Sequence, residues 1–354
     1  MKLPSHGSNP QFLYNSLKVP MPEKLIDFSV NLNPLGPPKP LTDILSGGTI
    51  GFSDYPDPQH TELRSRLSKA EGIDPSGILV GNGAAEIIHM IGCLLRGKHV
   101  AILHPAFSEY EQACLTFSCS LIHIMPSSLP VFEDFSRALE KADALFICNP
   151  NNPTGTVMDS GLLERIIAYG EANGCLVIVD EAFHDFLAAG ESCKELLGKH
   201  SNLIILRSMT KMFSMAGIRL GYALMAEGLR SRLVKYQPPW SVNSIALEAG
   251  RVCLDQREFV LKTRKYVIKE REKMFSFFRD NDFSFTDSST NFYLFKDNRL
   301  GNQLDLITFL LTNRIVPRHT YNFRGLEGKW MRMAVKDEEA NKVLMEVLRQ
   351  WRQK

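Results

Sequence analysis

Several side chains that could do chemistry directly follow short apolar runs of the sequence. Asp180 ends the run VIVD, where a carboxylate is costly unless a cation such as a protonated ring nitrogen pairs with it. A helix N-cap explains this aspartate equally well. Lys211 lies in the loop RSMTKMFSMAGIRLGY, where nearby positive charge could lower its pKa and let the amine form a Schiff base. A single lysine in a sequence more often lies at a solvated surface position than forms a Schiff base.

Other residues near these runs could bind the oxygens of an anionic ligand. Ser208 and Arg219, in the loop just described, could hold a phosphate. The segment GNGAAE, residues 81–86, lies between an expected strand and an expected helix, and its backbone N–H groups could hold a phosphate as well. An ordinary turn explains the same letters. The segment NPNNPTG, residues 149–155, predicts a rigid turn from which Asn152 could direct its amide at a ligand oxygen.

The elements that must position these residues alternate along the chain. Short apolar runs predict buried strands, and segments with helical spacing of apolar residues lie between them. The expected strands are GILVGN, HVAILHP, SLIHIM, ALFICNP, CLVIVDE, LIILRS and LGYALM. This alternation predicts βαβ units and a mostly parallel sheet. Ligands bind beyond the carboxyl ends of the strands in such a sheet, which is where the residues named above fall.

The 354 residues are enough for about two domains. Residues 1–40 are rich in Pro, Asn and Gly, and because Pro breaks helices we expect a loop or extended arm there without regular helix. Residues 41–240 carry the alternating pattern and predict a large α/β domain. Residues 241–354 open on a long charged helical stretch, REFVLKTRKYVIKEREKMFSFFRD, and continue with strand-like NFYLFK and WMRMAV, which together predict a smaller α+β domain.

The overall composition excludes several classes of function. With 41 Lys and Arg against 39 Asp and Glu, the net charge of +2 gives no general case for a nucleic-acid or membrane-surface binder. A hydrophobic share of 44% argues against wholesale disorder. No apolar run approaches the ~20 residues that span a bilayer. The first residues, MKLPSHGSNPQF, lack the apolar core of a signal peptide, so we expect a cytoplasmic protein.

The cysteines and histidines favour no metal site. The seven cysteines form no C-x-x-C pair, and several lie in apolar runs, where Cys is usually a small buried hydrophobe. We therefore expect reduced, structural thiols. The nine histidines show no H-E-x-x-H or comparable ligand spacing, so we expect no metal.

Taken together, the functional residues resemble one family of cofactor enzymes. A phosphate-holding loop, an Asn, an Asp for a ring nitrogen and a Schiff-base Lys follow one another in the order and spacing that resemble the fold-type I pyridoxal-phosphate enzymes, the aspartate-aminotransferase-like superfamily. The resemblance covers nearly the whole chain. It implies pyridoxal 5′-phosphate as cofactor, a large domain whose mostly parallel mixed sheet is sandwiched by helices, and a smaller α+β domain to which the arm contributes.

The resemblance also implies a role for each residue of the cofactor site. Lys211 would form the Schiff base, Asp180 would pair with the ring nitrogen, and Asn152 would bind the 3-oxygen of the ring. Phe107 would stack on the ring face, with Tyr110 as the second candidate. The cofactor phosphate would be held by Gly83, Ala84, Ala85, Ser208 and Arg219.

The resemblance implies a homodimer with shared active sites and an amino-acid substrate. Tyr55 in SDYPDP resembles the tyrosine that reaches the cofactor phosphate of the neighbouring subunit. Arg332 in WMRMAV resembles the arginine that pairs with the substrate α-carboxylate, for which a guanidinium fork is suited. Candidates for a substrate phosphate are His6, Asn33, Arg318 and Arg324. His6 could equally belong to a mobile terminal arm.

Two subfamilies compete within this resemblance. Histidinol-phosphate aminotransferases share the YPD and NNPTG motifs, and so do L-threonine-O-3-phosphate decarboxylases, which make aminopropanol phosphate for cobalamin assembly. Four features favour the decarboxylases: HGSN at residues 6–9, DFSVNLNPLG at 27–36, QPPWSVN at 237–243, and Phe183 where aminotransferases usually carry Tyr. Ala84 and Ala85 depart from the decarboxylase pattern, as does Lys336. A non-catalytic ligand sensor is a third hypothesis, against which the intact catalytic residues argue.

Overall fold

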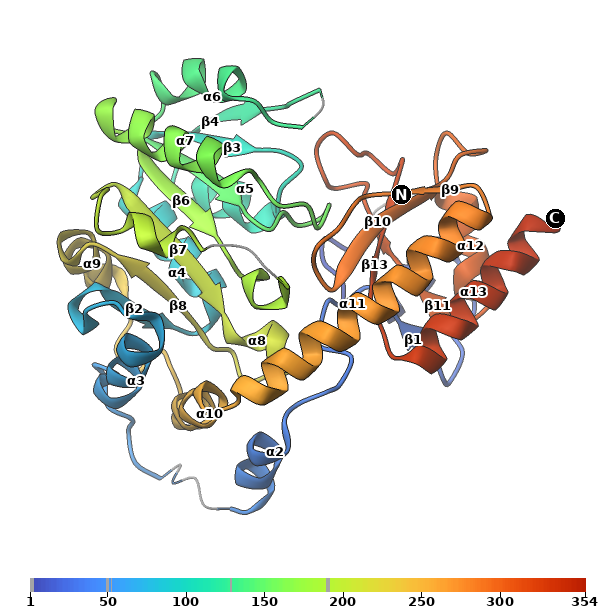
Figure 1. Ribbon diagram of the computed structural model, residues 1–354, viewed down its shortest axis with the longest axis horizontal. Coiled ribbons are helices and arrows are strands. Elements are labelled where there is room, and N and C mark those ends of the chain that lie inside the picture. Colours follow the sequence, from blue (N-terminus) through green and yellow to red (C-terminus); the bar gives the residue numbers. More distant parts are fainter. Residues whose placement is uncertain (1–2, 49–50, 52, 128, 189–191) are drawn as a thin grey trace.

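The computed structural model describes residues 3–48, 51, 53–127, 129–188 and 192–354. The chain forms a large part built around one sheet and a smaller part that holds both the N-terminal segment and the C-terminus (Figure 1). The helix α11 (Arg257–Asp280) connects the two parts and rises diagonally across the smaller one in this view. No helix among the described residues is long and apolar enough to cross a membrane.

The large part contains a seven-stranded sheet in the order β2-β8-β7-β6-β5-β3-β4. All neighbouring pairs among β7, β6, β5, β3 and β4 are parallel, whereas β8 runs antiparallel to both of its neighbours. The strands are β2 (Ile78–Gly81), β3 (His99–Leu103), β4 (Ser120–Ile124), β5 (Ala144–Cys148), β6 (Leu176–Asp180), β7 (Leu203–Ser208) and β8 (Gly221–Met225). The predicted α/β arrangement and all seven predicted strands are confirmed. The strand β4 was expected to be buried, but it is partly exposed because it lies at the edge of the sheet.

Both faces of this sheet are covered, because alternate side chains of each strand point to opposite faces. In β6, Val177 and Val179 pack in one apolar cluster with Leu163 and Ile166, from the helix α7. Ile178 lies between them in sequence and packs in a second cluster, with residues of α4 and α5. All three β6 side chains have no exposed surface. The continuous apolar run therefore reflects burial on both faces.

Helices separate most of these strands along the chain, and others precede and follow them. The helices of the large part are α2 (Lys39–Ser46), α3 (Thr61–Glu71), α4 (Gly83–Leu94), α5 (Ser108–Thr116), α6 (Phe132–Leu139), α7 (Ser160–Ala172), α8 (Met209–Met212), α9 (Glu227–Leu233) and α10 (Ser244–Leu254). Short 3-10 turns cover Pro75–Gly77, His184–Phe186, Cys193–Leu196 and Val234–Tyr236. The cap of α7 shows why a helix starts there: Asp159 accepts a bond from the N–H of Leu162, one of the donors that the first turn leaves without a partner.

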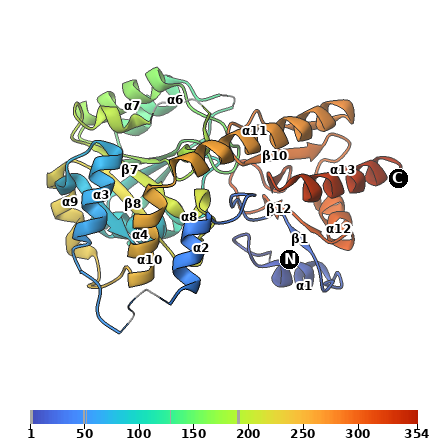
Figure 2. The same cartoon turned by 60° about the horizontal axis from the view of Figure 1, so that its bottom comes forward.

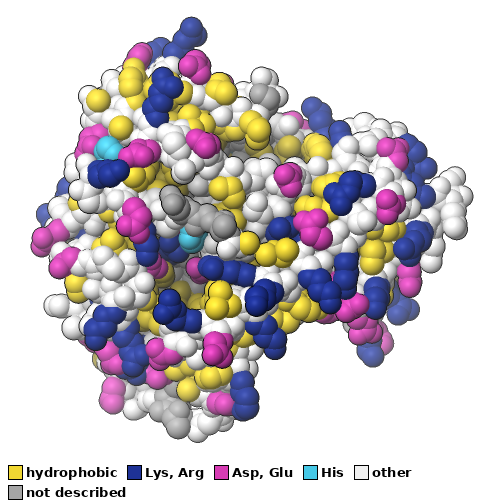
Figure 3. All heavy atoms as spheres, in the orientation of Figure 1, with side chains coloured by type: hydrophobic (Ala, Val, Ile, Leu, Met, Phe, Trp, Pro, Cys, Tyr) yellow, Lys and Arg dark blue, Asp and Glu magenta, His cyan; other side chains and the backbone are white. Residues whose placement is uncertain are grey.

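The smaller part contains an antiparallel sheet, β12-β13-β10-β9, packed against helices (Figure 1). Its strands are β9 (Phe283–Phe285), β10 (Phe292–Asp297), β12 (Arg318–His319) and β13 (Met331–Ala334), and its other helices are α12 (Leu304–Thr312) and α13 (Glu338–Arg352). The helix α11 buries Val267, Met274 and Phe278 and exposes Lys262 and Lys265, an amphipathic pattern. Lys and Arg side chains accordingly lie along its solvent face (Figure 3).

The N-terminal segment packs on the smaller part (Figure 2). The strand β1 (Ile26–Asp27) pairs in parallel with β11 (Ile315–Val316), and the hydroxyl of Tyr14 donates to the carbonyl of Leu311 at 2.8 Å. The expectation that residues 1–40 contain no regular helix is wrong, because α1 spans Pro10–Leu17. A proline in the first turn of a helix loses no hydrogen bond, and Asn9 caps this turn by accepting from the Phe12 N–H.

The helix α10 lies on the large part although it follows residue 241. It packs against α2 and α3 (Figure 2), so the chain returns from the large part to the smaller one along α11. The domain bounds 1–40, 41–240 and 241–354 stay a prediction.

Candidate active site

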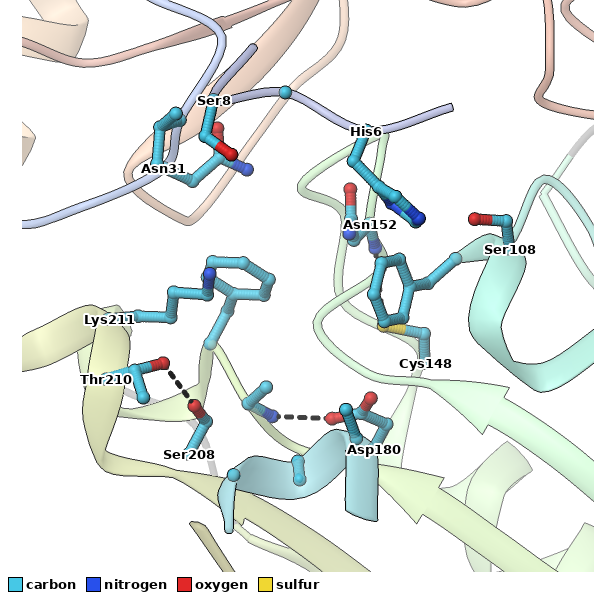
Figure 4. Close-up of a pocket in the computed structure, with 18 of the residues that line it drawn as sticks. His6, Ser8, Asn31, Ser108, Cys148, Asn152, Asp180, Ser208, Thr210 and Lys211 are labelled. Atoms are coloured by element: carbon cyan, nitrogen blue, oxygen red, sulfur yellow. Dashed lines mark hydrogen bonds between the residues drawn. The ribbon is translucent and has the colours of Figure 1, made fainter. Parts of the chain in front are cut away.

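A cavity of about 240 Å³ lies where the carboxyl ends of the parallel strands face the N-terminal segment and the smaller sheet. Side chains from both parts of the molecule and from the N-terminal segment line it. In Figure 4, Lys211 and Thr210 lie on one side, Asn152 and Ser108 on the other, Asp180 at the base, and His6 and Ser8 above. The candidates that line it are His6, Gly83, Ala84, Ala85, Phe107, Asn152, Asp180, Ser208, Lys211, Arg219, Arg318 and Arg332.

Lys211 reaches the cavity from the short helix α8, which directly follows β7. Burial, together with the guanidinium groups of Arg332 and Arg219, lowers the pKa of its amine to about 8, against an opposing effect of Asp180. A substantial fraction of this amine is therefore neutral near physiological pH. A neutral amine can attack a carbonyl carbon or take up a proton.

Asp180 ends β6 at the base of the cavity and is 4% exposed. Its Oδ1 accepts from the Ala182 N–H at 2.9 Å and its Oδ2 accepts from the Tyr110 hydroxyl at 2.5 Å. Burial raises the pKa of Asp180, while the Tyr110 hydroxyl and the Ala182 N–H, which stabilise the charged form, pull the pKa down. A carboxylate in this position is suited to a cationic partner in the cavity.

At the N-terminus of α4, two glycines bring the backbone so close to neighbouring groups that no side chain would fit between them. Gly83 has φ +75°, and a Cβ atom there would lie 2.5 Å from Nη2 of Arg219. A Cβ on Gly221, opposite on β8, would lie 2.5 Å from the backbone nitrogen of Ala84. Free N–H groups at the start of a 12-residue helix, together with a guanidinium, form a cradle for an anion such as phosphate.

Two hydroxyl groups complete this cradle. Ser208 ends β7, and its Oγ is 2.8 Å from Oγ1 of Thr210. Both residues line the cavity. Sequence analysis did not identify Thr210, although it lies next to Lys211 in the same motif. Its position one residue before Lys211 could have indicated that its side chain lies in the cavity.

Arg332 lies on β13 and faces the large part across the cavity. Its Nη1 donates to Oδ1 of Asn152 at 2.6 Å, and its Nη2 donates to the carbonyl of Ser29 at 2.8 Å. Nε has no partner among the described residues. Burial and the neighbouring Arg318 lower the pKa of Arg332 to about 9.

Arg318 lies beside Arg332, because these two residues are register partners on β12 and β13. Its Nη2 donates to the carbonyl of Ser5 at 2.6 Å and to Oδ1 of Asn322 at 2.7 Å. Burial lowers the pKa of Arg318 to about 10. Neither guanidinium has an ion-pair partner within 4 Å among the described residues, and the more distant carboxylate of Asp27 only partly offsets the effect of burial on Arg332.

The N-terminal segment closes one side of the cavity. Nε2 of His6 lies 3.1 Å from the carboxylate of Glu109, and its ring centroid is 6.2 Å from that of Phe107. Asn31 and Ser29 from the same segment also line the cavity. Sequence analysis quoted the motif that contains both residues but selected neither as a site residue, because a motif does not show which side chains face inward.

Two aromatic rings from the large part also line the cavity. Phe107 meets Tyr110 edge to face at 5.8 Å, and Phe183 meets Phe292 edge to face at 4.7 Å. Both Phe107 and Phe183 line the cavity. Their apolar surfaces could cover a flat ring and exclude water from it.

Three candidates from the sequence lie away from this cavity. Asn33 is buried behind Lys211, where its amide donates to the carbonyl of Met212 at 2.7 Å and to Thr263 at 2.8 Å. Arg324 pairs with Glu111 at 3.4 Å on the outer face of α5. Tyr55 is 81% exposed and packs on the Trp240 ring. Asn33 and Arg324 therefore do not face the cavity of this chain, and Tyr55 could act only outside it.

A second group of side chains could hold a metal ion. Donor atoms of His104, Glu111 and His123 all lie within 4.8 Å of one another. The two imidazoles already bond each other at 2.9 Å, and the guanidinium of Arg324 lies next to the carboxylate. The Nδ1 atom of His104 is buried without a partner among the described residues. A metal-bound histidine normally donates from this second nitrogen, so the group is poorly prepared for a metal.

Together, the cavity residues could hold a flat, phosphorylated heteroaromatic aldehyde. An anion cradle, a buried carboxylate and a buried amine of lowered pKa surround one space, and a pair of guanidiniums lies above it. A small substrate with two anionic groups could bind between the ring and this pair.

Comparison with known proteins identifies related sequences. A family model described as aminotransferase class I and II matches residues 23–348. A Caldanaerobacter subterraneus protein provisionally named threonine-phosphate decarboxylase is 36% identical, covering 90% of this chain and 88% of its own. The threonine-phosphate decarboxylase of Salmonella typhimurium is 30% identical, covering 98% and 96%. A histidinol-phosphate aminotransferase of Caldanaerobacter subterraneus is 35% identical, covering 85% of each chain.

Solved structures with the same fold include members of both subfamilies. Histidinol-phosphate aminotransferase from Clostridium acetobutylicum matches with a TM-score of 0.88 at 28% identity, over 93% of this chain and 99% of that one. L-Threonine-O-3-phosphate decarboxylase from Porphyromonas gingivalis matches at 0.85 and 24% identity, over 93% and 100%. The Sinorhizobium meliloti histidinol-phosphate aminotransferase, solved with pyridoxal-5′-phosphate, matches at 0.85 and 19% identity, over 97% and 95%. The predicted fold-type I architecture is confirmed.

Proposed function

The chain belongs to the aminotransferase class I and II family, and we propose that its reaction is the decarboxylation of L-threonine O-3-phosphate. The product would be (R)-1-aminopropan-2-yl phosphate, which places the enzyme in cobalamin biosynthesis. The cofactor is pyridoxal 5′-phosphate. Both threonine-phosphate decarboxylase relatives cover about nine tenths or more of the chain, which supports this choice within the family.

The observation that carries the proposal is the buried pair of guanidiniums. Arg318 and Arg332 are 4% and 8% exposed and face the cavity from adjacent strands, without a carboxylate partner among the described residues. Two desolvated cations held side by side are costly unless an anion binds between them. Threonine phosphate carries a carboxylate and a phosphate on neighbouring carbons, so one small molecule supplies both negative groups.

The residues of the cavity fit the cofactor. The backbone at Gly83 and Gly221 leaves no room for a side chain and presents the N–H groups of α4, a cradle for its phosphate. Ser208, Thr210 and Arg219 would add donors to that phosphate. When bound, pyridoxal phosphate supplies a conjugated ring that accepts the electron pair of a broken bond at the substrate Cα.

Two residues of the chain would control protons at this ring and at Cα. Asp180 would hold a proton at the ring nitrogen, because its carboxylate is buried and open to the cavity. Lys211 would bind the aldehyde carbon and later deliver a proton to Cα. An amine with a pKa of about 8 is suited to both tasks near neutral pH.

The two guanidiniums would select the bond that breaks. The bond at Cα that lies perpendicular to the ring plane is the one that can be cleaved. Arg332, bonded to Asn152, would hold the carboxylate, and Arg318 with His6 would hold the phosphate. Because binding at two points fixes rotation about the bond from nitrogen to Cα, these contacts would orient the carboxylate for loss.

A homodimer with shared active sites is part of the proposal. Tyr55 is 81% exposed and stacks with Trp240 at 4.8 Å, so its hydroxyl is free to approach a second copy of the chain. The phosphate of the partner's cofactor is the proposed target. Size measurement of the purified protein tests this part.

Incubation of the purified, cofactor-loaded enzyme with threonine phosphate tests the reaction. We expect release of carbon dioxide at the same rate with and without 2-oxoglutarate. No release of carbon dioxide under either condition would refute the proposal.

A histidinol-phosphate aminotransferase is the second candidate, because relatives with this name are nearly as similar in sequence and the Clostridium structure has the same fold. This activity would require 2-oxoglutarate and would form glutamate. The same incubations with histidinol phosphate therefore separate the two candidates.

A further inference from the structure

Tyr110 is a buried residue of the cavity for which the proposed chemistry has no role so far. It lies on α5, is 1% exposed, and its ring stacks on that of Phe146 at 5.0 Å with an interplanar angle of 14°. The Phe107 ring meets it edge to face, at 5.8 Å between centroids. The ring of Tyr110 is therefore fixed on two sides, and only its hydroxyl has a polar contact to make.

The hydroxyl of Tyr110 points at the carboxylate of Asp180. It donates to Oδ2 at 2.5 Å, the short end of the range for a hydroxyl that bonds a charged carboxylate oxygen. The other carboxylate oxygen, Oδ1, accepts from the Ala182 N–H at 2.9 Å. Each oxygen of Asp180 thus has one protein donor, and both donors lie on elements that the sheet holds in place.

Tyr110 can act only as a donor in this contact. Burial and the charge of Asp180 raise the pKa of the phenol well above its ordinary value, so the hydroxyl stays protonated at any pH where the enzyme works. The neighbouring thiol of Cys148 brings no charge, because burial and Asp180 raise its pKa to about 12. The amine of Lys211 lies across the cavity from Asp180 in Figure 4, and its charge also lowers the pKa of that carboxylate.

We propose that Tyr110 is a positioning residue that acts through Asp180 to keep the ring nitrogen of the bound cofactor protonated. A hydrogen bond donated to a carboxylate makes that carboxylate a weaker base. The proton between Asp180 and the ring nitrogen then resides on nitrogen, where its positive charge lets the ring accept electrons. Without the hydroxyl, the carboxylate becomes more basic and draws the proton toward itself.

This role is separate from ring stacking, for which Phe107 is the proposed residue. It rests on the cofactor of the proposed function and not on the choice between decarboxylation and transamination. Both reactions need an electron-accepting ring.

The test is the substitution Tyr110→Phe, which removes one oxygen and keeps the ring volume. Cofactor-free protein is loaded with pyridoxal phosphate labelled with ¹⁵N at the ring, and the ¹⁵N chemical shift reports directly whether that nitrogen carries a proton. We expect the wild-type signal at the protonated position and the variant signal moved toward the neutral position. The dissociation constant of the cofactor should rise by about 3- to 10-fold.

The matched control is Tyr14→Phe. Tyr14 is also a fully buried tyrosine whose hydroxyl donates one bond, to the carbonyl of Leu311 at 2.8 Å, and it does not line the cavity. We expect this variant to keep the wild-type ¹⁵N shift and cofactor affinity. A general effect of losing a buried hydroxyl would change both variants alike.

A double-substitution cycle shows whether Tyr110 acts through Asp180. Asp180→Asn alone should move the ¹⁵N signal fully to the neutral position, and adding Tyr110→Phe to it should change nothing further. An additional shift in the double variant would contradict the proposal, as would an unchanged shift and affinity in Tyr110→Phe. Wild-type protein that fails to bind the cofactor would instead refute the proposed function.

One measurement is made on the wild-type protein, and Tyr110→Phe serves only to assign its signal. The hydroxyl proton of a short, buried bond exchanges slowly and should resonate downfield of the amide protons in the wild-type ¹H spectrum. Loading the cofactor should shift this signal, because the ring nitrogen then competes for the same carboxylate. The Tyr110 hydroxyl signal is the downfield signal that is absent from Tyr110→Phe. If this signal does not shift when the wild-type protein binds the cofactor, the proposal is refuted, whatever the stability of the variant.

Discussion

The two sides of the cavity are held in place by different kinds of contact. We call the side formed by Gly83, Ala84, Asp180, Ser208 and Lys211 the floor, and the side formed by His6, Ser8, Arg318 and Arg332 the wall. Every floor residue lies at a strand end or within three residues of one. The wall depends on contacts between distant segments, such as the bond from Arg318 to the Ser5 carbonyl, 313 residues apart in sequence.

Because of this difference, the two sides of the cavity are suited to different tasks. The floor is built into the seven-stranded sheet, so its geometry is fixed once the large part folds. The wall requires the N-terminal segment, the smaller sheet and the large part to meet, as in the bond from Arg332 to Asn152. Substitutions in the floor should therefore affect the cofactor most, and substitutions in the wall should affect mainly the substrate.

The floor residue whose loss should matter most is Lys211. The substitution Lys211→Met removes the amine that would bind the aldehyde and move the proton at Cα, and we expect turnover to fall by about 10²–10⁴-fold. A steady-state assay measures this loss. Lys98→Met is the control, because Lys98 is an exposed lysine paired with Asp143 away from the cavity. Retention of more than a tenth of wild-type turnover would contradict the assignment.

The same substitution should stabilise the protein when the cofactor is absent. Lys211 has a pKa of about 8 in the folded protein against about 10.4 unfolded, which corresponds to a penalty of at most about 3 kcal/mol below pH 8, where the amine is charged in both states. The penalty fades as the pH rises from 8 to about 10.5. Urea unfolding of cofactor-free protein should show Lys211→Met to be more stable at pH 7 and nearly equal at pH 10.5. Equal stability at pH 7 would show that the amine is not destabilised by its surroundings.

Arg332 tests the wall. The substitution Arg332→Met removes charged hydrogen bonds to the substrate worth about 1.5–3 kcal/mol, so kcat/KM should fall by about 10- to 150-fold. The affinity for the cofactor should fall much less than kcat/KM, because Arg332 acts on the cofactor site only through its bond to Asn152 and its effect on the pKa of Lys211. Arg271→Met is a matched control, since Arg271 is also 8% exposed but donates to the Thr290 carbonyl outside the cavity. Loss of cofactor binding in Arg332→Met would remove the distinction between floor and wall.

Phe183 should have the smallest effect. The substitution Phe183→Tyr adds a hydroxyl to a side chain that lines the cavity. One extra hydrogen bond there is worth about 0.5–1.5 kcal/mol. We expect turnover to change by less than about 10-fold and no transamination to appear in a coupled glutamate assay. Appearance of transamination would mean that this single position, and not the two guanidiniums, chooses the reaction.

The contrast between floor and wall also explains what the sequence could predict. Asp180, Ser208 and Lys211 were found because strand ends, glycines and apolar runs are local signals, and parallel strands bring their carboxyl ends together. Asn33 and Arg324 were chosen from motifs in the same way, but tertiary packing turns the first into the core and the second outward. The helix α1 was missed because its proline was taken as a helix breaker without regard to its place in the first turn.

The decisive measurement is a ¹H NMR spectrum of the reaction with threonine phosphate in D₂O, without a keto acid. The account predicts that the substrate keeps its original Cα proton until the carboxylate leaves, and that the product then carries that proton and one deuterium on the same carbon. A substrate that exchanges its Cα proton for deuterium and forms no 1-aminopropan-2-yl phosphate would contradict the account, because the bond being broken would then be Cα–H.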